Sequence, residues 1–204
     1  PGRILDVYKN ASYSKAGGGN NFYNREHTWP SSYGFPNLTN LNYPYTDTHM
    51  LYLSDIGYNS DRSSKVFAQC HANCNERTTQ VNDGMGGGSG LYSAQSNWTQ
   101  GGSTTGDWQT WGGRKGDVAR AVLYMDIRYE GGRHNVTRVS EPNLILTDNR
   151  SLIRGTGSNA STAYMGLLTT LLQWHLEDPP DERERIRNDV IQSFQGNRNP
   201  FIDH

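Results

Sequence analysis

The chain of 204 residues contains few hydrophobic residues, few lysines and only two cysteines. Only 33% of its residues are hydrophobic, but 11% are aromatic, and large aromatic side chains bury enough area to sustain a core. This composition excludes a disordered chain and predicts a polar, loop-rich globular protein. No run of about 18 apolar residues occurs, so we expect no membrane-spanning helix.

The net charge of -1 excludes a protein that binds polyanions over its whole surface. Lysine is scarce, because only four of the 19 basic residues are lysines and the others are arginines. Arginine is the better bidentate ligand for phosphate, but surface salt bridges account for the same bias. From the number of arginines alone, we favour surface salt bridges over phosphate binding as the explanation.

The cysteines Cys70 and Cys74 lie four positions apart. No second pair of Cys or His residues follows at zinc-finger spacing, which disfavours a zinc site. We predict a local disulfide, with two buried thiols as the alternative. A disulfide implies an oxidising compartment, and we expect that a chain that starts at Pro1 rather than Met has been processed or trimmed. We therefore expect a secreted or periplasmic protein whose signal peptide has been removed.

We expect a single domain over residues 1–204, because neither repeats nor an internal boundary stand out. We also expect a monomer. The part between about residues 22 and 66 is read as strand, loop, strand and helix. Phe22–Trp29 and His49–Leu53 are the predicted strands. Ser54-Asp55 then forms an N-cap for a short helix that carries Asn59 and Arg62.

Three later helices are predicted from apolar spacing, over Gly116–Glu130, Asn159–Leu176 and Asp181–Gln195. The arginines of the first are expected on a solvated face, with a phosphate-tracking face as the alternative. The last helix has a predicted apolar seam made of Ile186, Val190, Ile191 and Phe194.

Three tryptophans lie between the predicted helix that carries Asn59 and the predicted helix over Gly116–Glu130. They could stack on bases, but we expect them to belong to the core. They are Trp98, Trp108 and Trp111.

Glu26 and His27 place a carboxylate beside an imidazole. Near neutral pH the carboxylate suits a hard metal ion, and the imidazole can accept a proton. Mg²⁺ prefers oxygen ligands and keeps several waters, a preference that Glu26 and Asn59 match with one oxygen each. Hydrolysis of a phosphodiester needs a base for the water and a cation for the developing charge. His27 and a metal on Glu26 and Asn59 would meet both needs.

Four segments carry a resemblance to a known family, in the family's own order from about Tyr23 to the end of the chain. The segments are Asn24–Pro30 (Asn-Arg-Glu-His-Thr-Trp-Pro), Asp47–Ser63, Gly116–Met125 and Gln195–Asp203. Together they resemble the bacterial endonuclease I family, whose members are secreted or periplasmic nucleases with a ββα-metal core.

The resemblance implies an α+β fold in which a ββα-metal nuclease core is surrounded by helices and long loops. It implies a metal-dependent endonuclease that cleaves DNA, and also RNA, with little sequence preference and leaves 5′-phosphate ends. His27 matches the family's general base, and Glu26 and Asn59 match its metal ligands. The metal would be Mg²⁺, with Ca²⁺ or Mn²⁺ as alternatives.

Better-known members carry a phosphate-stabilising arginine in the loop between the two strands, where residues 31–46 have none. We therefore assign this catalytic role to Arg62, with Arg25 and Arg198 as further substrate-binding candidates. Asp47 and His49 are expected to support the site without binding the metal directly.

Two other functions are compatible with the same residues. One is a non-catalytic nucleic-acid-binding module on this fold, against which Glu26, His27 and Asn59 argue, because a binder needs none of them. The other is a phosphodiesterase that acts on small molecules, which a closed pocket rather than an open groove would favour.

Overall fold

The computed structural model describes residues 2–204, which form two compact units. Unit 1 contains the chain up to Glu26 together with Tyr52–Lys115. Unit 2 contains His27–Leu51 and Gly116–His204. The expectation of one domain over residues 1–204 stays a prediction.

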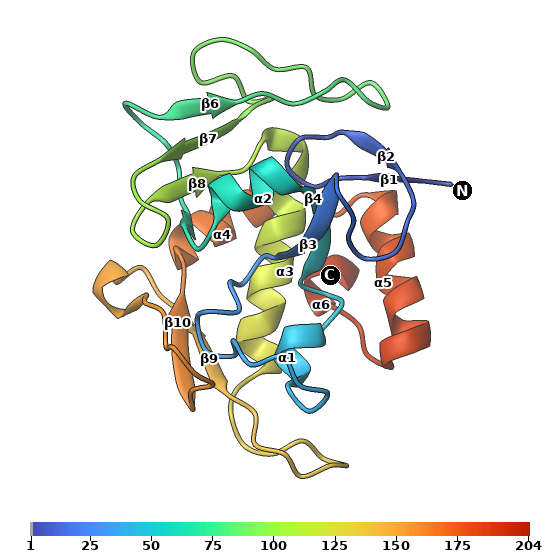
Figure 1. Ribbon diagram of the computed structural model, residues 1–204, viewed down its shortest axis with the longest axis vertical. Coiled ribbons are helices and arrows are strands. Elements are labelled where there is room, and N and C mark those ends of the chain that lie inside the picture. Colours follow the sequence, from blue (N-terminus) through green and yellow to red (C-terminus); the bar gives the residue numbers. More distant parts are fainter. Residues whose placement is uncertain (1) are drawn as a thin grey trace. The chain divides into compact units, whose positions relative to one another are not determined.

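Unit 1 is built mainly of strands. The first two, β1 (Arg3–Leu5) and β2 (Ser12–Ser14), pair antiparallel. A four-stranded sheet has the order β5-β8-β7-β6, in which only β5 and β8 run parallel, and Figure 1 shows β8, β7 and β6 side by side. Its strands are β5 (Val66–Phe67), β6 (Asn75–Arg77), β7 (Asn97–Gln100) and β8 (Asp107–Gln109), and the 3₁₀ turn η1 (Gly112–Arg114) follows.

Three tryptophans form much of the core of unit 1, as predicted. Trp98, Trp108 and Trp111 are all buried, and Trp108 meets the ring of Tyr8 edge-on at 5.0 Å between centroids. Two of the three indole N–H groups are bonded within the unit, because Trp98 Nε1 donates to Ser93 O at 3.0 Å and Trp111 Nε1 donates to Val7 O at 2.9 Å. Burial of all three confirms the core interpretation over base stacking.

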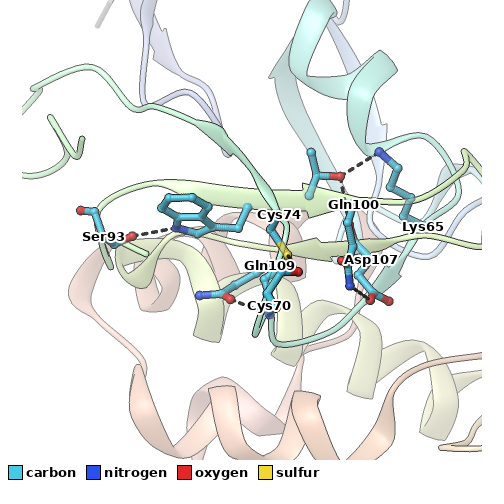
Figure 2. Close-up of a disulfide and its surroundings, with 10 residues drawn as sticks. Lys65, Cys70, Cys74, Ser93, Gln100, Asp107 and Gln109 are labelled. Carbon is cyan, nitrogen blue, oxygen red and sulfur yellow. Dashed lines mark hydrogen bonds between the residues drawn. A yellow bond between two sulfur atoms is a disulfide. The ribbon is translucent and has the colours of Figure 1, made fainter. Parts of the chain in front are cut away.

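The predicted disulfide between Cys70 and Cys74 is confirmed (Figure 2). The Cys70 amide donates to Gln109 Oε1 of β8 at 2.8 Å, so the bridged loop is attached to an inner strand of the four-stranded sheet. Figure 2 also shows Lys65, whose Nζ donates to Thr99 Oγ1 on β7 at 2.8 Å.

The strand–strand–helix order predicted for residues 22–66 is confirmed, and with it the α+β class. Strands β3 (Tyr23–His27) and β4 (Leu51–Asp55) form a two-stranded sheet, and α2 (Ile56–Arg62) follows β4 directly. Asp55 caps α2 as predicted, because its Oδ1 accepts from the amides of Gly57 at 2.9 Å and Tyr58 at 3.3 Å. This arrangement places Asn59 and Arg62 on the helix next to β3.

Unit 2 is mainly helical, and its longest helix, α3 (Lys115–Arg128), confirms the prediction for residues 116–130. Strands β9 and β10 lie side by side and parallel (Figure 1). No helix among residues 2–204 has both the length and the apolar character needed to cross a membrane. The remaining elements are α1 (Tyr43–Thr46), β9 (Asn143–Leu146), η2 (Arg150–Leu152), β10 (Thr162–Met165), α4 (Leu168–Glu177), α5 (Glu182–Gln195) and α6 (Pro200–Asp203).

The helix predicted over Asn159–Leu176 is wrong in its first half. Thr162–Met165 forms β10 and only Leu168–Glu177 is helical. Ala163 and Met165 are buried at alternate positions, which is the spacing of a strand and not of a helix. Pairing with β9, about twenty residues earlier in the chain, outweighs the local helical preference.

The charged face predicted for α3 is wrong at Arg120, which is fully buried. Its Nε donates to Glu184 Oε1 of α5 at 2.7 Å, and its NH1 donates to Asp178 O at 2.6 Å. A Cβ at Gly116 would lie 1.9 Å from the same Asp178 oxygen, so only glycine fits there. The arginine neutralises a buried carboxylate of its own unit instead of facing solvent.

The apolar seam predicted for α5 is also wrong, because most of it faces solvent. Three of its four members are about half or more exposed: Ile186 (54%), Val190 (49%) and Phe194 (88%). The helix buries a different row of positions, namely Glu184, Asn188 and Ile191. Hydrogen bonds and an ion pair attach this buried face to the rest of unit 2. Apolar spacing alone did not identify the face, because two of its three residues are polar. Asp181 and Gly196 cap the helix, so its ends agree with the predicted range Asp181–Gln195 to within one residue.

Candidate functional site

Glu26 lies on β3 of unit 1 with its side chain 2% exposed. The Tyr8 hydroxyl donates to its Oε1 at 2.7 Å, and Arg62 NH1 lies 3.1 Å from the same oxygen. Burial raises the pKa of Glu26, and the opposing effects of the Arg62 charge and the Tyr8 hydrogen bond do not cancel it. No described residue donates a hydrogen bond to Oε2. The carboxylate is therefore held through one oxygen and presents the other.

Asn59 on α2 has its amide fixed in one orientation. Its Nδ2 donates to Asn24 Oδ1 at 2.6 Å and to Arg25 O at 3.0 Å, both on β3. Because these acceptors use the NH₂ group, the orientation of the amide is determined by its donors. No described residue donates to Asn59 Oδ1, which is thus available as an oxygen ligand.

The two oxygens suit a hard divalent cation. Among residues 2–204, no group of three or more His, Cys, Asp or Glu is placed to hold a metal ion. Glu26 and Asn59 belong to the same unit, and Asn24, which orients Asn59, shares a strand face with Glu26 two residues away. A carboxylate and an amide oxygen, with water for the rest, match the preference of Mg²⁺.

Arg62 is directed at Glu26 and is 1% exposed. Its guanidinium lies over the ring of Phe67 at 4.5 Å, and NH1 also donates to Ser63 O at 3.3 Å. A buried charge needs a partner of opposite sign, and these two residues meet that need for each other. Contact between Arg62 and a substrate phosphate stays a prediction.

The other two candidate arginines differ in how their side chains are engaged. Arg198 NH1 donates to Asp189 Oδ1 at 2.7 Å and its NH2 donates to Asp203 Oδ1 at 2.6 Å, so it joins α5 to α6. Arg25 is exposed on β3, next to Gly18, and makes no side-chain ion pair or hydrogen bond with the described residues. Their roles in substrate binding stay predictions, and only Arg25 has a guanidinium not already engaged.

His27 lies in unit 2 and is half-buried. Its Nε2 is 2.9 Å from the carbonyl oxygen of Tyr45 on α1, and the two rings are 4.6 Å apart. A carbonyl oxygen only accepts, so Nε2 carries the proton and Nδ1 is the nitrogen that can accept one. The Tyr45 carbonyl therefore sets the tautomer of His27. A role of His27 as the general base stays a prediction.

Asp47 and His49 are buried within unit 2. His49 is fully buried, its Nε2 lies 3.2 Å from Asn197 O, and burial lowers its pKa. That Asp47 and His49 support the site stays a prediction. The hydrogen bonds that Asp47 accepts show that it holds parts of unit 2 together. Its carboxylate accepts from His49 N, Gln195 Nε2, Tyr124 OH and Tyr129 OH at 2.8–2.9 Å.

The sequence analysis missed three groups that position the predicted site residues. Tyr8 is 18 residues from Glu26, and no local pattern links the two. The Tyr45 group is a backbone carbonyl, which any residue supplies. Asn24 alone had a signal, because it lies two residues before Glu26 on a predicted strand and therefore on the same face.

Comparisons with known proteins give one consistent result. The family model described as Endonuclease I matches residues 3–204. An extracellular ribonuclease of Bacillus amyloliquefaciens is 37% identical over 207 residues, covering 100% of this chain and 59% of the relative. An extracellular ribonuclease of Bacillus subtilis (strain 168) is 36% identical over 207 residues, again covering 100% of this chain and 59% of the relative. The chain thus spans about three fifths of the length of these relatives.

Proposed function

Because the chain belongs to the endonuclease I family, we propose that it is a metal-dependent endonuclease that hydrolyses phosphodiester bonds in RNA and DNA. The observation that carries the proposal is the pair of oxygens on Glu26 and Asn59. Each lacks a hydrogen-bond donor among the described residues, while neighbouring groups hold the rest of its side chain. A module that only binds nucleic acid has no use for such a pair.

In the proposed mechanism His27 is the general base. Its Nδ1 takes a proton from water as the water attacks phosphorus, and the Tyr45 carbonyl holds the ring and the proton on Nε2. Breaking the bond to the 3′ oxygen leaves a 5′-phosphate end. A divalent ion held by Glu26 and Asn59, Mg²⁺ first and Ca²⁺ or Mn²⁺ as alternatives, would supply positive charge for the attacked phosphate and the leaving oxygen.

Arg25 is the proposed contact for a substrate phosphate, because its guanidinium is exposed and not engaged by described residues. Arg62 takes a different part in the proposal from the one expected from sequence. It holds Glu26 Oε1 and balances its charge, which orients the other carboxylate oxygen.

The substrate and the compartment follow from the relatives and from the disulfide. Both relatives are named extracellular ribonucleases, which supports RNA as a substrate and secretion as the destination of this chain. The Cys70–Cys74 disulfide supports the same oxidising location. Cleavage of DNA is proposed from the family alone.

The test is digestion of a single-stranded RNA and of a supercoiled plasmid, with Mg²⁺ and with excess EDTA. We expect both substrates to be cut internally with Mg²⁺ and left intact with EDTA, because hydrolysis needs the cation. Binding without cleavage under both conditions would establish the non-catalytic alternative. Turnover of bis-(p-nitrophenyl) phosphate with both polymers intact would establish the small-molecule alternative.

Asn59→Ala removes one of the two proposed ligand oxygens. We expect its Mg²⁺ requirement to rise by at least about tenfold, because a site with so few protein ligands depends on each one. The measurement is the midpoint of a Mg²⁺ titration, followed by the thermal unfolding midpoint without substrate and by cleavage rate. Ser60→Ala, on the exposed next position of α2, is the matched control. An unchanged titration for Asn59→Ala would remove Asn59 from the metal site.

A further inference from the structure

A second surface of unit 1 has the features of a base-binding site. An open depression of about 530 Å³ lies against the β1–β2 hairpin, with Tyr13, Asn21 and Phe22 among its walls. Phe22 exposes 66% of its surface although it immediately precedes β3. The Tyr13 and Phe22 rings are stacked, 6.2 Å apart and inclined by only 20°. The result is a stacked aromatic pair whose Phe22 ring is largely exposed.

The backbone of Phe22 and the side chain of Tyr13 are held in place before any ligand arrives. The Phe22 amide donates to Asn20 Oδ1 at 2.8 Å, and its carbonyl accepts from Ile56 N at 3.1 Å. The Tyr13 hydroxyl donates to Asp55 Oδ2, and its ring also lies 5.8 Å from the ring of Tyr23. A surface that is already ordered loses little conformational entropy when it binds.

The charge around this surface is suited to a polyanion. Between Val7 and Arg25 the chain contains three cations and no carboxylate. Lys9 is paired with Asp55, whereas Lys15 and Arg25 are exposed and make no ion pair with the described residues. Arg3 adds a further exposed cation to the wall of the depression. Of these cations only Arg3 lines the depression, while Lys15 lies in the chain between the wall residues Ser14 and Ala16. An aromatic surface with cations nearby is the combination that binds single-stranded nucleic acid.

We propose that the stacked rings of Tyr13 and Phe22 form a subsite for an unpaired nucleobase of a single-stranded substrate, with Phe22 as the residue on which the base stacks. The subsite rests on the proposed nuclease function. Phe22 precedes Glu26 by four residues of extended chain, roughly 13 Å at the rise of a strand. A strand that continues from the subsite past Arg25 toward Glu26 therefore needs only a few nucleotides. Bases in a duplex are already stacked and cannot use the site.

The test measures binding in EDTA, where the substrate stays intact. Fluorescence anisotropy of a labelled single-stranded oligoribonucleotide, of the duplex of the same sequence and of an abasic strand of equal length gives three dissociation constants. We expect Phe22→Ala to weaken binding of the single strand about 5- to 100-fold, the range for losing one base–aromatic stack. Binding of the duplex and of the abasic strand should not change.

Matched variants separate stacking from apolar contact and from loss of fold. Phe22→Trp should bind the single strand at least as tightly as the parent, whereas Phe22→Leu should bind as weakly as Phe22→Ala, because leucine has no aromatic face. Leu91→Ala, at a position that is 85% exposed elsewhere in unit 1, should bind like the parent.

Three results would overturn the subsite: parent-like binding by Phe22→Ala, equal weakening for single strand and duplex, or parent-like binding by Phe22→Leu. Each is independent of catalysis. A parent that cuts RNA in Mg²⁺ while Phe22→Ala binds normally retains the proposed nuclease function and loses the subsite. A parent that binds single strands through Phe22 but never cuts them retains the subsite and loses the nuclease.

Discussion

His27→Ala is expected to lower the rate of nucleic-acid hydrolysis by roughly 10²–10⁴-fold, the contribution of a positioned general base. The loss should fall on the rate constant of cleavage, because the variant keeps Glu26, Asn59 and the exposed cations near β3. The measurement is single-turnover cleavage of a labelled RNA in Mg²⁺ by the parent and the variant.

The fold and the metal site should be almost unchanged in this variant. His27 is half-buried, so water can replace it as the partner of the Tyr45 carbonyl. The thermal midpoint and its rise with Mg²⁺ should therefore stay close to the parent's values. His71→Ala, an exposed histidine in the disulfide loop, is the matched control and should cleave normally. Cleavage by His27→Ala at the parent's rate would show that another group is the base.

Arg62→Ala is expected to lower the free energy of unfolding by about 3–5 kcal/mol, because it leaves the Glu26 carboxylate buried without its cation. For a chain of this size each kcal/mol corresponds to roughly 2–4 °C, so the thermal midpoint should fall by roughly 6–20 °C. Thermal unfolding followed by circular dichroism measures the shift.

Two comparisons test whether the loss comes from the buried pair. Arg77→Ala breaks the ion pair with Asp61, in which both side chains are about a third or more exposed, and should cost at most about 1 kcal/mol. Combining Arg62→Met with Glu26→Gln should recover part of the stability, because no charge then stays buried alone. If Arg62→Ala kept the parent's midpoint and lost only turnover, the arginine would act on the phosphate, as the sequence analysis predicted.

Local signals predicted much of the fold. The order β3, β4, α2 followed from two apolar strands and the Asp55 cap, and the ends of α5 followed from Asp181 and Gly196. These features depend on residues within one turn or one strand, where backbone preferences and hydrogen bonds are short in range. The errors at Asn159–Leu176 and along α5 have the opposite origin. There a distant strand, or polar partners from other helices, decided which side chains became buried.

The sequence by itself determined the chemical groups of the candidate site: Glu26, His27 and Asn59, in the order and spacing that the endonuclease I family shares. Only the tertiary structure decided how those groups are held. Tyr8 and Arg62 fix Glu26 Oε1, Asn24 turns the amide of Asn59, and the Tyr45 carbonyl selects the His27 tautomer. The reason is physical: a residue's chemistry is local, whereas its orientation and burial depend on partners that folding brings from elsewhere in the chain.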